Sequence, residues 1–426
     1  MSDDFESKAR PKADASPRKA LIASVTGYAM DGFDLLILGF MLPAITIGLS
    51  LNSSEAGSLV TWTLLGAVAG GLIFGQLSDR YGRVKMLSVS ILLFSVFTGL
   101  CAVAQGYWDL LIYRTLAGFG LGGEFGIGMA LVAEAWPAHK RNRVSSYVGM
   151  GWQAGVLAAA VLTPLLLPHI GWRGMFLVGL LPALVSFVIR HTMGEPEEFV
   201  RAAANPISFG ERFRELFKDR ATGKASLGVI VLTSVQNFGY YGIMIWMPSY
   251  LSKQFGFSLT ASGTWTAVTV IGMTFGIWLF GQMADRFGRW KIFLLYQAGA
   301  AIMVLTYANL TDPMVMLVVG GVMGIFVNGM IGGYGALISD LYPAQARATA
   351  QNVLFNVGRG FGGLGPLVVG AVAYSLSFSV AIMMLASIYV LAMAATLFLL
   401  PKLNGGESMD SALGDQATSA DVVPGK

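Results

Sequence analysis

The sequence has little of the chemistry on which most enzymes depend. Its 426 residues include one cysteine, Cys101, and three histidines, all of them between the long apolar segments. A single cysteine cannot form an internal disulfide, and it does not support a metal site built from thiolates. The sequence also shows no nucleophile, metal-cluster or cofactor motif. We therefore predict that the protein is not an enzyme and uses no metal ion and no cofactor.

Charged residues are also scarce. They make up 12% of the chain, whereas hydrophobic residues make up 55%. This leaves too little polar surface to cover a soluble protein of this size, so the composition predicts an integral membrane protein. The net charge of +4 is explained by the basic loops of such a protein and requires no nucleic-acid partner.

Long apolar segments are abundant instead. Each of twelve runs has roughly 18–25 mainly apolar residues, enough to cross a hydrocarbon core of about 30 Å. Because a helix satisfies its own backbone in lipid, we predict an all-α membrane protein with twelve transmembrane helices. The predicted spans are 21–48, 57–78, 86–104, 109–133, 144–168, 172–190, 225–252, 261–283, 291–309, 313–338, 349–375 and 378–400. The 54 glycines cluster within these spans and indicate close helix packing.

Lysine and arginine are distributed asymmetrically along this pattern. Residues 1–20 are polar and basic and lack the features of a cleavable signal, so we expect a cytoplasmic tail there, and another at 401–426. Almost all the basic residues lie in these tails and in the even-numbered connections, whereas the opposite loops hold only Arg173 and Lys253. By the positive-inside rule, both termini are predicted to be cytoplasmic.

The chain contains an internal repeat. GQLSDRYGRVK at 75–85 recurs 206 residues later as GQMADRFGRWK at 281–291, and the same displacement relates EAWPAHKR at 134–141 to DLYPAQAR at 340–347. Two motifs at one offset predict parallel repeats of six helices. We expect a six-helix bundle at 21–190, a cytoplasmic linker at 191–224 and a second six-helix bundle at 225–400. Such bundles can rock to expose a central site to either side.

The repeated loops carry matching charges. They could simply mark cytoplasmic loops, but the recurrence of the whole pattern Gly-x-x-x-Asp-Arg-x-Gly-Arg-x-Lys favours a specific role. Its glycines permit a tight turn, its aspartates can cap helix N-termini, and its arginines can pair with carboxylates at helix ends. We predict a breakable latch between the bundles, made of gating residues Asp79, Arg80, Arg83, Glu134, Arg141, Asp285, Arg286, Arg289, Asp340 and Arg347.

Over nearly its whole length the sequence resembles the major facilitator superfamily, to which the pattern of these loops is highly specific. DGFD at 31–34, the segment 114–124 (RTLAGFGLGGE), Arg347 and the sequence NVGR that ends at Arg359 make it similar to the aromatic acid:proton symporters. Sialate and monocarboxylate symporters are a close second. The resemblance implies a multi-pass protein of the bacterial inner membrane that imports a small organic acid anion together with protons by alternating access. We expect the protein to be a monomer.

Several charges lie inside the predicted spans, where a charged side chain is costly unless it has a partner or a wet cavity. Asp31 and Asp34 lie roughly 16–20 Å from the start of the first span, on one face with Tyr28. Burial and mutual repulsion favour proton uptake by at least one of these two acids. The alternative is that both acids only form hydrogen bonds that hold helices together. Glu124 and Arg114 are further proton-coupling candidates. An ion pair for Glu124, and snorkelling or structural pairing for Arg114, are the alternatives.

Arg359 is the candidate anchor for the substrate carboxylate, because its planar fork suits a carboxylate. At the 206-residue offset Arg359 aligns with Gln153, and Asp31 aligns with Asn237. The first bundle is therefore acidic at the site and the second bundle is cationic. We expect Arg359 to lie across a central cavity from the acids. Residues 236–241 combine amides with tyrosines and could stack a ring and bind its substituents. The predicted substrate-binding residues are Arg359, Tyr28, Trp152, Gln153, Gln236, Asn237, Tyr240, Tyr241, Tyr334, Phe355 and Asn356, although any one aromatic could be core or interfacial.

The sequence leaves other functions open. A channel or a sensor would have the same span pattern, and a uniporter or an exporter would need no inward proton coupling. The pairs of Gln236 with Tyr240 and of Asn237 with Tyr241 favour an aromatic acid over a small metabolite such as lactate. A benzoate-like, hydroxybenzoate-like, pyridine-carboxylate, muconate or sialate-like anion would satisfy the same residues.

Overall fold

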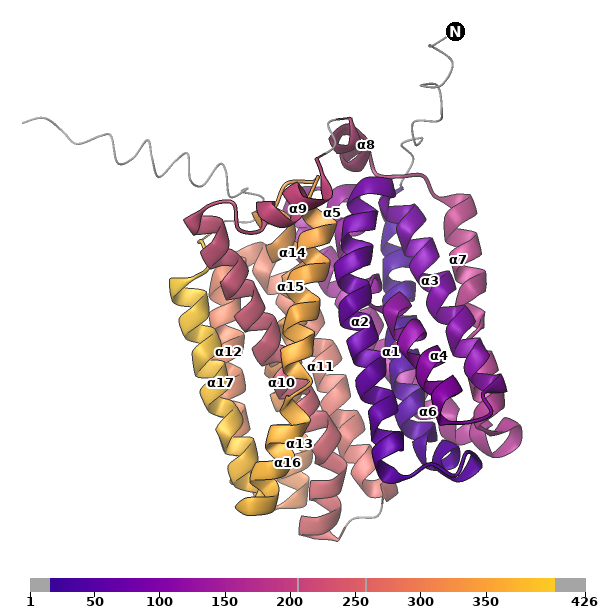
Figure 1. Cartoon of the computed structure of the whole chain (residues 1–426). Helices are drawn as coiled ribbons and strands as arrows, with labels where there is room; N and C mark the ends of the chain where they lie inside the picture. The colour runs from indigo at the N-terminus through magenta and orange to yellow at the C-terminus, as the bar shows by residue number, and fades with distance from the viewer. Residues whose placement is uncertain (1–15, 205–206, 257–258, 403–426) are drawn as a thin grey trace, which may run out of the picture. The chain divides into compact units, whose positions relative to one another are not determined.

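The computed structural model describes residues 16–204, 207–256 and 259–402, and the described residues form helices joined by short connections (Figure 1). Most of the two predicted cytoplasmic tails, residues 1–15 and 403–426, lies outside the described residues. The helices are α1 (Pro17–Gly48), α2 (Ser53–Tyr81), α3 (Arg83–Leu100), α4 (Tyr107–Leu121), α5 (Glu124–Ala135), α6 (Arg141–Val178), α7 (Leu181–Thr192), α8 (Glu197–Ala203), α9 (Phe209–Glu215), α10 (Arg220–Phe255), α11 (Leu259–Phe287), α12 (Arg289–Ala308), α13 (Pro313–Gly329), α14 (Ile331–Leu341), α15 (Arg347–Gly362), α16 (Gly365–Ser375) and α17 (Phe378–Phe398).

The spans agree with the predicted membrane fold. Among the described residues, 11 helical stretches are long and apolar enough to cross a membrane. One of them, Ala138–Ile189, has 52 residues and would measure about 78 Å as one straight helix, more than twice the hydrocarbon core. It is interrupted at Gly171, whose φ of 64° is not helical, close to the predicted division between 144–168 and 172–190. Counting this stretch as two crossings gives the twelve-helix arrangement.

Contacts group the described residues into two compact units. The first unit comprises residues 16–136, 147–213 and 344–360, and the second comprises 137–146, 214–343 and 361–402. Each unit therefore contains a short segment from the other half of the sequence. The predicted division into bundles at 21–190 and 225–400 stays a prediction.

The two units repeat one packing scheme. In the first unit α2 packs along α4, α1 along α5, and α3 against α4 and α7. In the second unit α11 packs along α13, α10 contacts α14, and α12 packs against α13 and α17. These pairs correspond under the 206-residue offset, so the repeat seen in the loops extends to the helices.

Tight turns place the repeated loops at equivalent ends of the units. Gly82, between α2 and α3, has a φ of 115°, and Gly288, between α11 and α12, has a φ of 88°. Both values lie in the left-handed region, which a residue with a Cβ rarely adopts, and this confirms the predicted need for glycine. We call the end of each unit that carries its repeated loop the charged end. It is the end predicted to be cytoplasmic.

Candidate functional site

Asp34 is held firmly in the first unit. An ion pair of 3.0 Å joins its Oδ2 to Nη1 of Arg114 on α4, and the hydroxyl of Thr98 on α3 donates to Oδ1 at 2.7 Å. The side chain of Arg114 is fully buried and that of Asp34 is nearly so. Arg114 therefore does not snorkel toward the membrane surface. The structure instead shows the predicted alternative of structural pairing, with Asp34 as the partner.

Asp31 has a looser partner. Its Oδ2 lies 3.7 Å from Nη1 of Arg359 on α15, and neither carboxylate oxygen accepts a hydrogen bond from any described residue. The Arg359 guanidinium also lies over the ring of Trp152, 5.1 Å from its centroid. Contrary to the expectation of an intervening cavity, Arg359 belongs to the first unit and contacts Asp31 directly. The sequence offset gives no information on this pairing, because the two residues come from non-equivalent helices.

Glu124 is buried, and no cation of the described residues forms an ion pair with it. It is the first residue of α5, and a Cβ added at Gly27 of α1 would lie 2.6 Å from its Oε2. Neither of its carboxylate oxygens has a hydrogen-bond partner among the described residues, and the Ser90 hydroxyl donates to the carbonyl of Gly120 at 2.6 Å instead. The predicted alternative of an ion pair with an arginine is not observed in the described part of the chain.

Aromatic rings line the same part of the first unit. Tyr28 contacts Phe125 and Trp152, with ring centroids 5.2 and 5.3 Å apart, and Phe125 stacks on Phe355 at 3.7 Å. Four rings and the Arg359 guanidinium thus form one buried cluster. Phe125, which immediately follows Glu124, was not among the predicted residues.

Two amides complete this group. Asn356 donates to the carbonyl of Gly122 at 3.1 Å and to that of Asn352 at 2.9 Å. Gln153 is fully buried, and neither polar atom of its side chain has a hydrogen-bond partner within the described residues. Gln153 is therefore able to bind a ligand through a donor and an acceptor, whereas the amide NH₂ of Asn356 is already engaged.

The remaining predicted substrate residues lie in the second unit. Gln236 donates to Asn328 at 2.5 Å, Asn237 donates to the carbonyl of Thr233 at 2.8 Å, and the rings of Tyr240 and Tyr241 meet edge to face at 5.2 Å. The fully buried Tyr334 donates to the carbonyl of Leu232 at 3.0 Å.

Because its hydroxyl is satisfied inside the unit, Tyr334 is packed as a core residue. Tyr241, which is partly exposed, is better placed to meet a ligand.

The charged end of the first unit contains an ion-pair cluster. Arg83 pairs with Asp79 at 2.6 Å and with Glu134 at 2.9 Å, and Arg347 pairs with Glu134 at 3.4 Å and with Glu198 at 2.8 Å. The Asp79 carboxylate also accepts from the backbone N–H groups that begin α15. The predicted pairing of the loop arginines with carboxylates is confirmed here, as is the helix-capping role of Asp79.

The second unit has an equivalent cluster. Asp340 pairs with Arg289 at 2.9 Å and with Arg141 at 2.8 Å, while Asp285 lies 3.5 Å from Arg143. Each main pair reproduces a pair of the first unit at the 206-residue offset. Asp285 differs from Asp79, because its oxygens accept no hydrogen bond from any described residue and its predicted capping role is not observed.

Arg80 and Arg286 do not join these clusters. Their guanidinium groups lie over the rings of the residues that follow them, 5.2 Å from Tyr81 and 5.3 Å from Phe287. Consecutive residues of a helix point about 100° apart, so Arg80 and Arg286 face away from the arginines that the preceding residues, Asp79 and Asp285, meet.

Some partners were missed at the level of sequence. Thr98 lies in an apolar span and Glu198 lies in the charged linker. Neither residue belongs to a spaced pattern that would mark it as a partner of a buried charge. Glu195 accepts from the backbone N–H groups of Arg83, Val84 and Lys85 at 2.7, 3.1 and 3.1 Å, and so caps α3. Burial raises the pKa of the Glu195 carboxyl, while these bonds and Arg83 lower it.

The fold and the paired buried charges define a class of protein. A helical membrane protein with two units of one repeated design, whose buried acids and arginines lie inside the spans, has the arrangement of a membrane transporter. The family model of the Major Facilitator Superfamily matches residues 25–308 and 229–419, and the chain belongs to that superfamily. It is a multi-pass protein of the bacterial inner membrane.

Known proteins agree with this assignment. The chain is 65% identical over 393 residues to a Haemophilus influenzae protein whose name assigns it to metabolite transport, covering 91% of this chain and 97% of that one. It is 32% identical over 365 residues to a probable 4-methylmuconolactone transporter of Cupriavidus pinatubonensis, covering 84% of each chain. The structure of the proton:xylose symporter XylE with 6-bromo-6-deoxy-D-glucose matches 93% of this chain and 98% of its own, with a TM-score of 0.77 at 17% identity. That last likeness is one of fold.

Proposed function

We propose that the protein is a proton-coupled symporter that imports a small organic acid anion, with an aromatic or other planar unsaturated carboxylate as its preferred substrate. The observation that carries this proposal is the setting of Arg359, which lies over the ring of Trp152 and 3.7 Å from the carboxylate of Asp31. An arginine in an apolar span with an aromatic surface beside it suits a ligand that has one carboxylate and one flat face.

The loose contact of Arg359 suggests how substrate and proton are coupled. A substrate carboxylate can accept two parallel hydrogen bonds from the guanidinium, which is a stronger contact than Arg359 makes with Asp31. Asp31 then loses its cation while it stays buried, and an unpaired buried carboxylate is costly unless it binds a proton. Binding of the anion would therefore favour binding of one proton, and the loaded site would stay electrically balanced.

Glu124 is the second proton carrier in this scheme. Three acids and two arginines lie at the site, and Glu124 is the acid that has no cation among the described residues. A proton on Glu124 removes the uncompensated charge. Asp34, fixed by Arg114 and Thr98, would position α1 and modulate the charge at Asp31.

The ion-pair clusters of the charged ends would act as the gating latch of a monomeric carrier. In this proposal the pairs break and re-form as the six-helix bundles at 21–190 and 225–400 rock about the linker 191–224, with both termini in the cytoplasm. Asp79, Arg83, Glu134 and Arg347 form one part of the latch, and Asp285, Arg289, Asp340 and Arg141 form the other.

The relative named as a 4-methylmuconolactone transporter supports the substrate class. A muconolactone has one carboxylate on a small unsaturated ring, which is the combination that Arg359 and the rings of Tyr28, Trp152 and Phe355 would recognise. A thermal-shift screen of the purified protein against benzoate, hydroxybenzoates, nicotinate, muconate, muconolactones and sialate would identify the ligand, because a ligand selective for the folded state raises apparent stability.

The test of coupling is uptake into proteoliposomes. With the ligand from the screen, the wild-type protein should accumulate substrate under an inward proton gradient, and Asp31→Asn should abolish accumulation while it preserves counterflow. Glu197→Gln, which removes a carboxylate with 71% exposure from α8, is the matched control and should transport normally. Accumulation by Asp31→Asn at the wild-type level would exclude Asp31 from coupling.

A further inference from the structure

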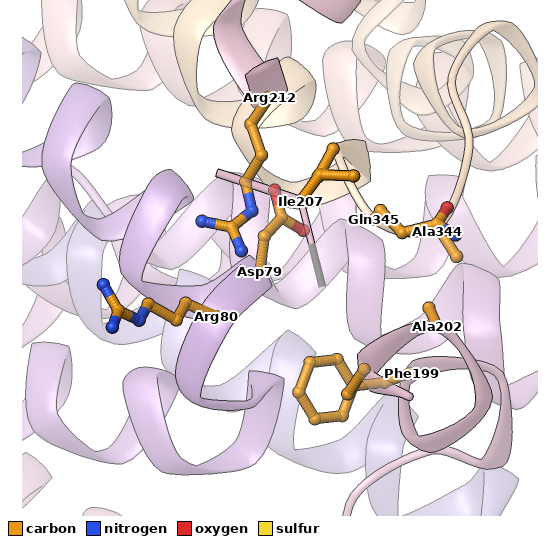
Figure 2. A pocket seen from close by; sticks show the side chains of 9 residues that line it. Asp79, Arg80, Phe199, Ala202, Ile207, Arg212, Ala344 and Gln345 are labelled. Carbon is orange, nitrogen blue, oxygen red and sulfur yellow. The ribbon is translucent and has the colours of Figure 1, made fainter. Parts of the chain in front are cut away.

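A small cavity lies at the charged end of the first unit, where the end of α2, α8, α9 and the loop before α15 meet (Figure 2). It contains about 320 Å³ of empty space, part of which is open to solvent. Its lining residues, all from the first unit, are Asp79, Arg80, Phe199, Ala202, Ala203, Ile207, Arg212, Ala344 and Gln345. Neither the proton-coupling scheme nor the substrate site uses this cavity.

Arg212 is the unusual residue of the cavity. Its side chain reaches from α9 toward the end of α2, as Figure 2 shows, and the residue is only 3% exposed. Its Nε has no hydrogen-bond partner, and no carboxylate forms an ion pair with it, among the described residues. Burying a cation without a partner is unfavourable. Burial accordingly lowers the pKa of Arg212, Asp79 raises it, and Arg80 and Arg83 lower it.

Asp79 does not neutralise Arg212. Its carboxylate already forms a 2.6 Å ion pair with Arg83 and accepts backbone bonds from Ala348 and Thr349. The acid in the cavity is therefore fully engaged with other groups.

A second cation adds to the excess of positive charge. Arg80 lines the cavity, is exposed, and lies over the ring of Tyr81 with no acid partner among the described residues. Because it is exposed, its long side chain can turn toward a ligand at small cost. Gln345 on the opposite side supplies an amide that can donate a further hydrogen bond.

We propose that this cavity is a binding site for a phosphate group, with Arg212 as its buried ligand and Arg80 as its mobile one. The guanidinium group binds the oxygens of a phosphate in a bidentate manner, and two arginines match a multiply charged anion better than a single carboxylate would. The phosphate can belong to an anionic lipid headgroup or to a free phosphate. In either case it supplies the negative charge that Arg212 lacks, and it joins α2, α8, α9 and the loop that precedes Arg347.

The test uses the full-length protein and three variants. Inorganic phosphate is titrated into detergent-solubilised protein at constant ionic strength, with chloride as the reference anion, and the apparent melting temperature is recorded. The lipid arm compares nanodiscs of phosphatidylglycerol with nanodiscs of phosphatidylcholine. Arg212→Gln removes the buried cation, Ala202→Phe fills the cavity but keeps both arginines, and Arg214→Gln removes an exposed arginine of α9 that does not line the cavity.

Phosphate should stabilise the wild-type protein and Arg214→Gln, and its Kd should rise at least about tenfold in Arg212→Gln and in Ala202→Phe. Stabilisation by phosphatidylglycerol but not by phosphate, lost in the same two variants, would assign the site to a lipid headgroup. If Arg212→Gln is poorly folded, Ala202→Phe carries the test alone. No effect of either probe on the wild-type protein, or an equal effect on all variants, would overturn the proposal.

Discussion

At the scale of single residues, the two arginines of the spans have different settings. Arg114 meets Asp34 at 3.0 Å, and Thr98 donates a hydrogen bond to the same carboxylate, so two groups of the first unit hold Asp34 in place. Arg359 meets Asp31 at 3.7 Å with no supporting hydrogen bond to that carboxylate. A loose contact is easier to exchange for a ligand, and this difference makes Arg359 the better candidate for the substrate carboxylate.

Replacing Arg359 should therefore impair binding. Losing a desolvated, charge-assisted contact costs on the order of 2–5 kcal/mol, so Arg359→Ala should weaken substrate affinity by at least about tenfold. Arg359→Lys should also bind poorly, because an ammonium group cannot reproduce the bidentate fork. Binding is measured by calorimetry on the purified protein. Arg347→Ala, at the charged end, is the control and should keep its affinity; wild-type affinity in Arg359→Ala would contradict the assignment.

Replacing Glu124 tests the second proton carrier. Glu124→Gln resembles the protonated acid, so the variant should bind substrate and perform counterflow, whereas accumulation driven by a proton gradient should fall by at least about tenfold. Counterflow should also depend less on pH than in the wild-type protein. Gradient-driven uptake that is unchanged in Glu124→Gln would leave Asp31 as the sole coupling residue of the scheme.

Residue types and depths could be predicted at this scale, but pairings could not. DGFD and the GGE sequence that ends at Glu124 placed three acids in the spans, because charges there are rare enough to stand out. That Arg359 meets Asp31, and that Glu124 meets neither arginine, depends on how non-equivalent helices approach each other. Thr98 gave no signal, since a threonine in an apolar span is common.

At the scale of helices, glycine determines the packing of the first unit. A Cβ added at Gly70 of α2 would lie 1.8 Å from the carbonyl oxygen of Phe119 on α4, and one added at Gly118 of α4 would lie 2.0 Å from that of Thr63 on α2. The sequence predicted close contacts from the number of glycines, but not which helices meet. It also predicted 349–375 as one helix, whereas the structure has α15 and α16 with an interruption after Gly362. The run Gly-Gly-Leu-Gly-Pro at 362–366 explains this break.

A pair of substitutions in α2 tests this packing. Gly70→Ala should destabilise the protein by about 1–3 kcal/mol, because the backbone of α4 must move to admit the methyl group. Gly57→Ala, on the same helix but with no atom within 4 Å of the added Cβ, should be neutral or slightly stabilising. The melting temperatures of the two variants are compared in one detergent. Equal stability of both would show that the helices can separate without cost.

At the scale of the whole molecule, the repeat is the main organising feature. Glu134 pairs with Arg83 and Arg347, and Asp340 pairs with Arg289 and Arg141, so each unit places one acid between two arginines. The loop motifs made this arrangement predictable, because two copies at one offset imply two equivalent clusters. The assignment of 344–360 to the first unit and of 137–146 to the second was not predictable from the repeat alone.

The equivalent acids should respond alike to mutation. Glu134→Gln leaves two buried arginines short of a carboxylate, and Asp340→Asn leaves the buried Arg289 and the partly buried Arg141 short of one. Breaking buried pairs of this kind is strongly destabilising. We expect each variant to lower the rate of transport by about tenfold or more and to leave substrate affinity within about twofold of the wild-type value. Transport is measured in proteoliposomes and affinity on purified protein. A loss of affinity equal to the loss of transport would argue against a gating role.

The packing of residues 344–360 into the first unit has a consequence for biogenesis. Asp31 and Asp79 enter the membrane early in translation, but their partners Arg359, Ala348 and Thr349 belong to the last part of the chain. At about 5–20 residues per second, some tens of seconds separate their synthesis. The first unit therefore cannot complete its packing until the ribosome has synthesised α15. A premature stop codon before residue 344 should leave a truncated product that the cell's quality-control proteases recognise.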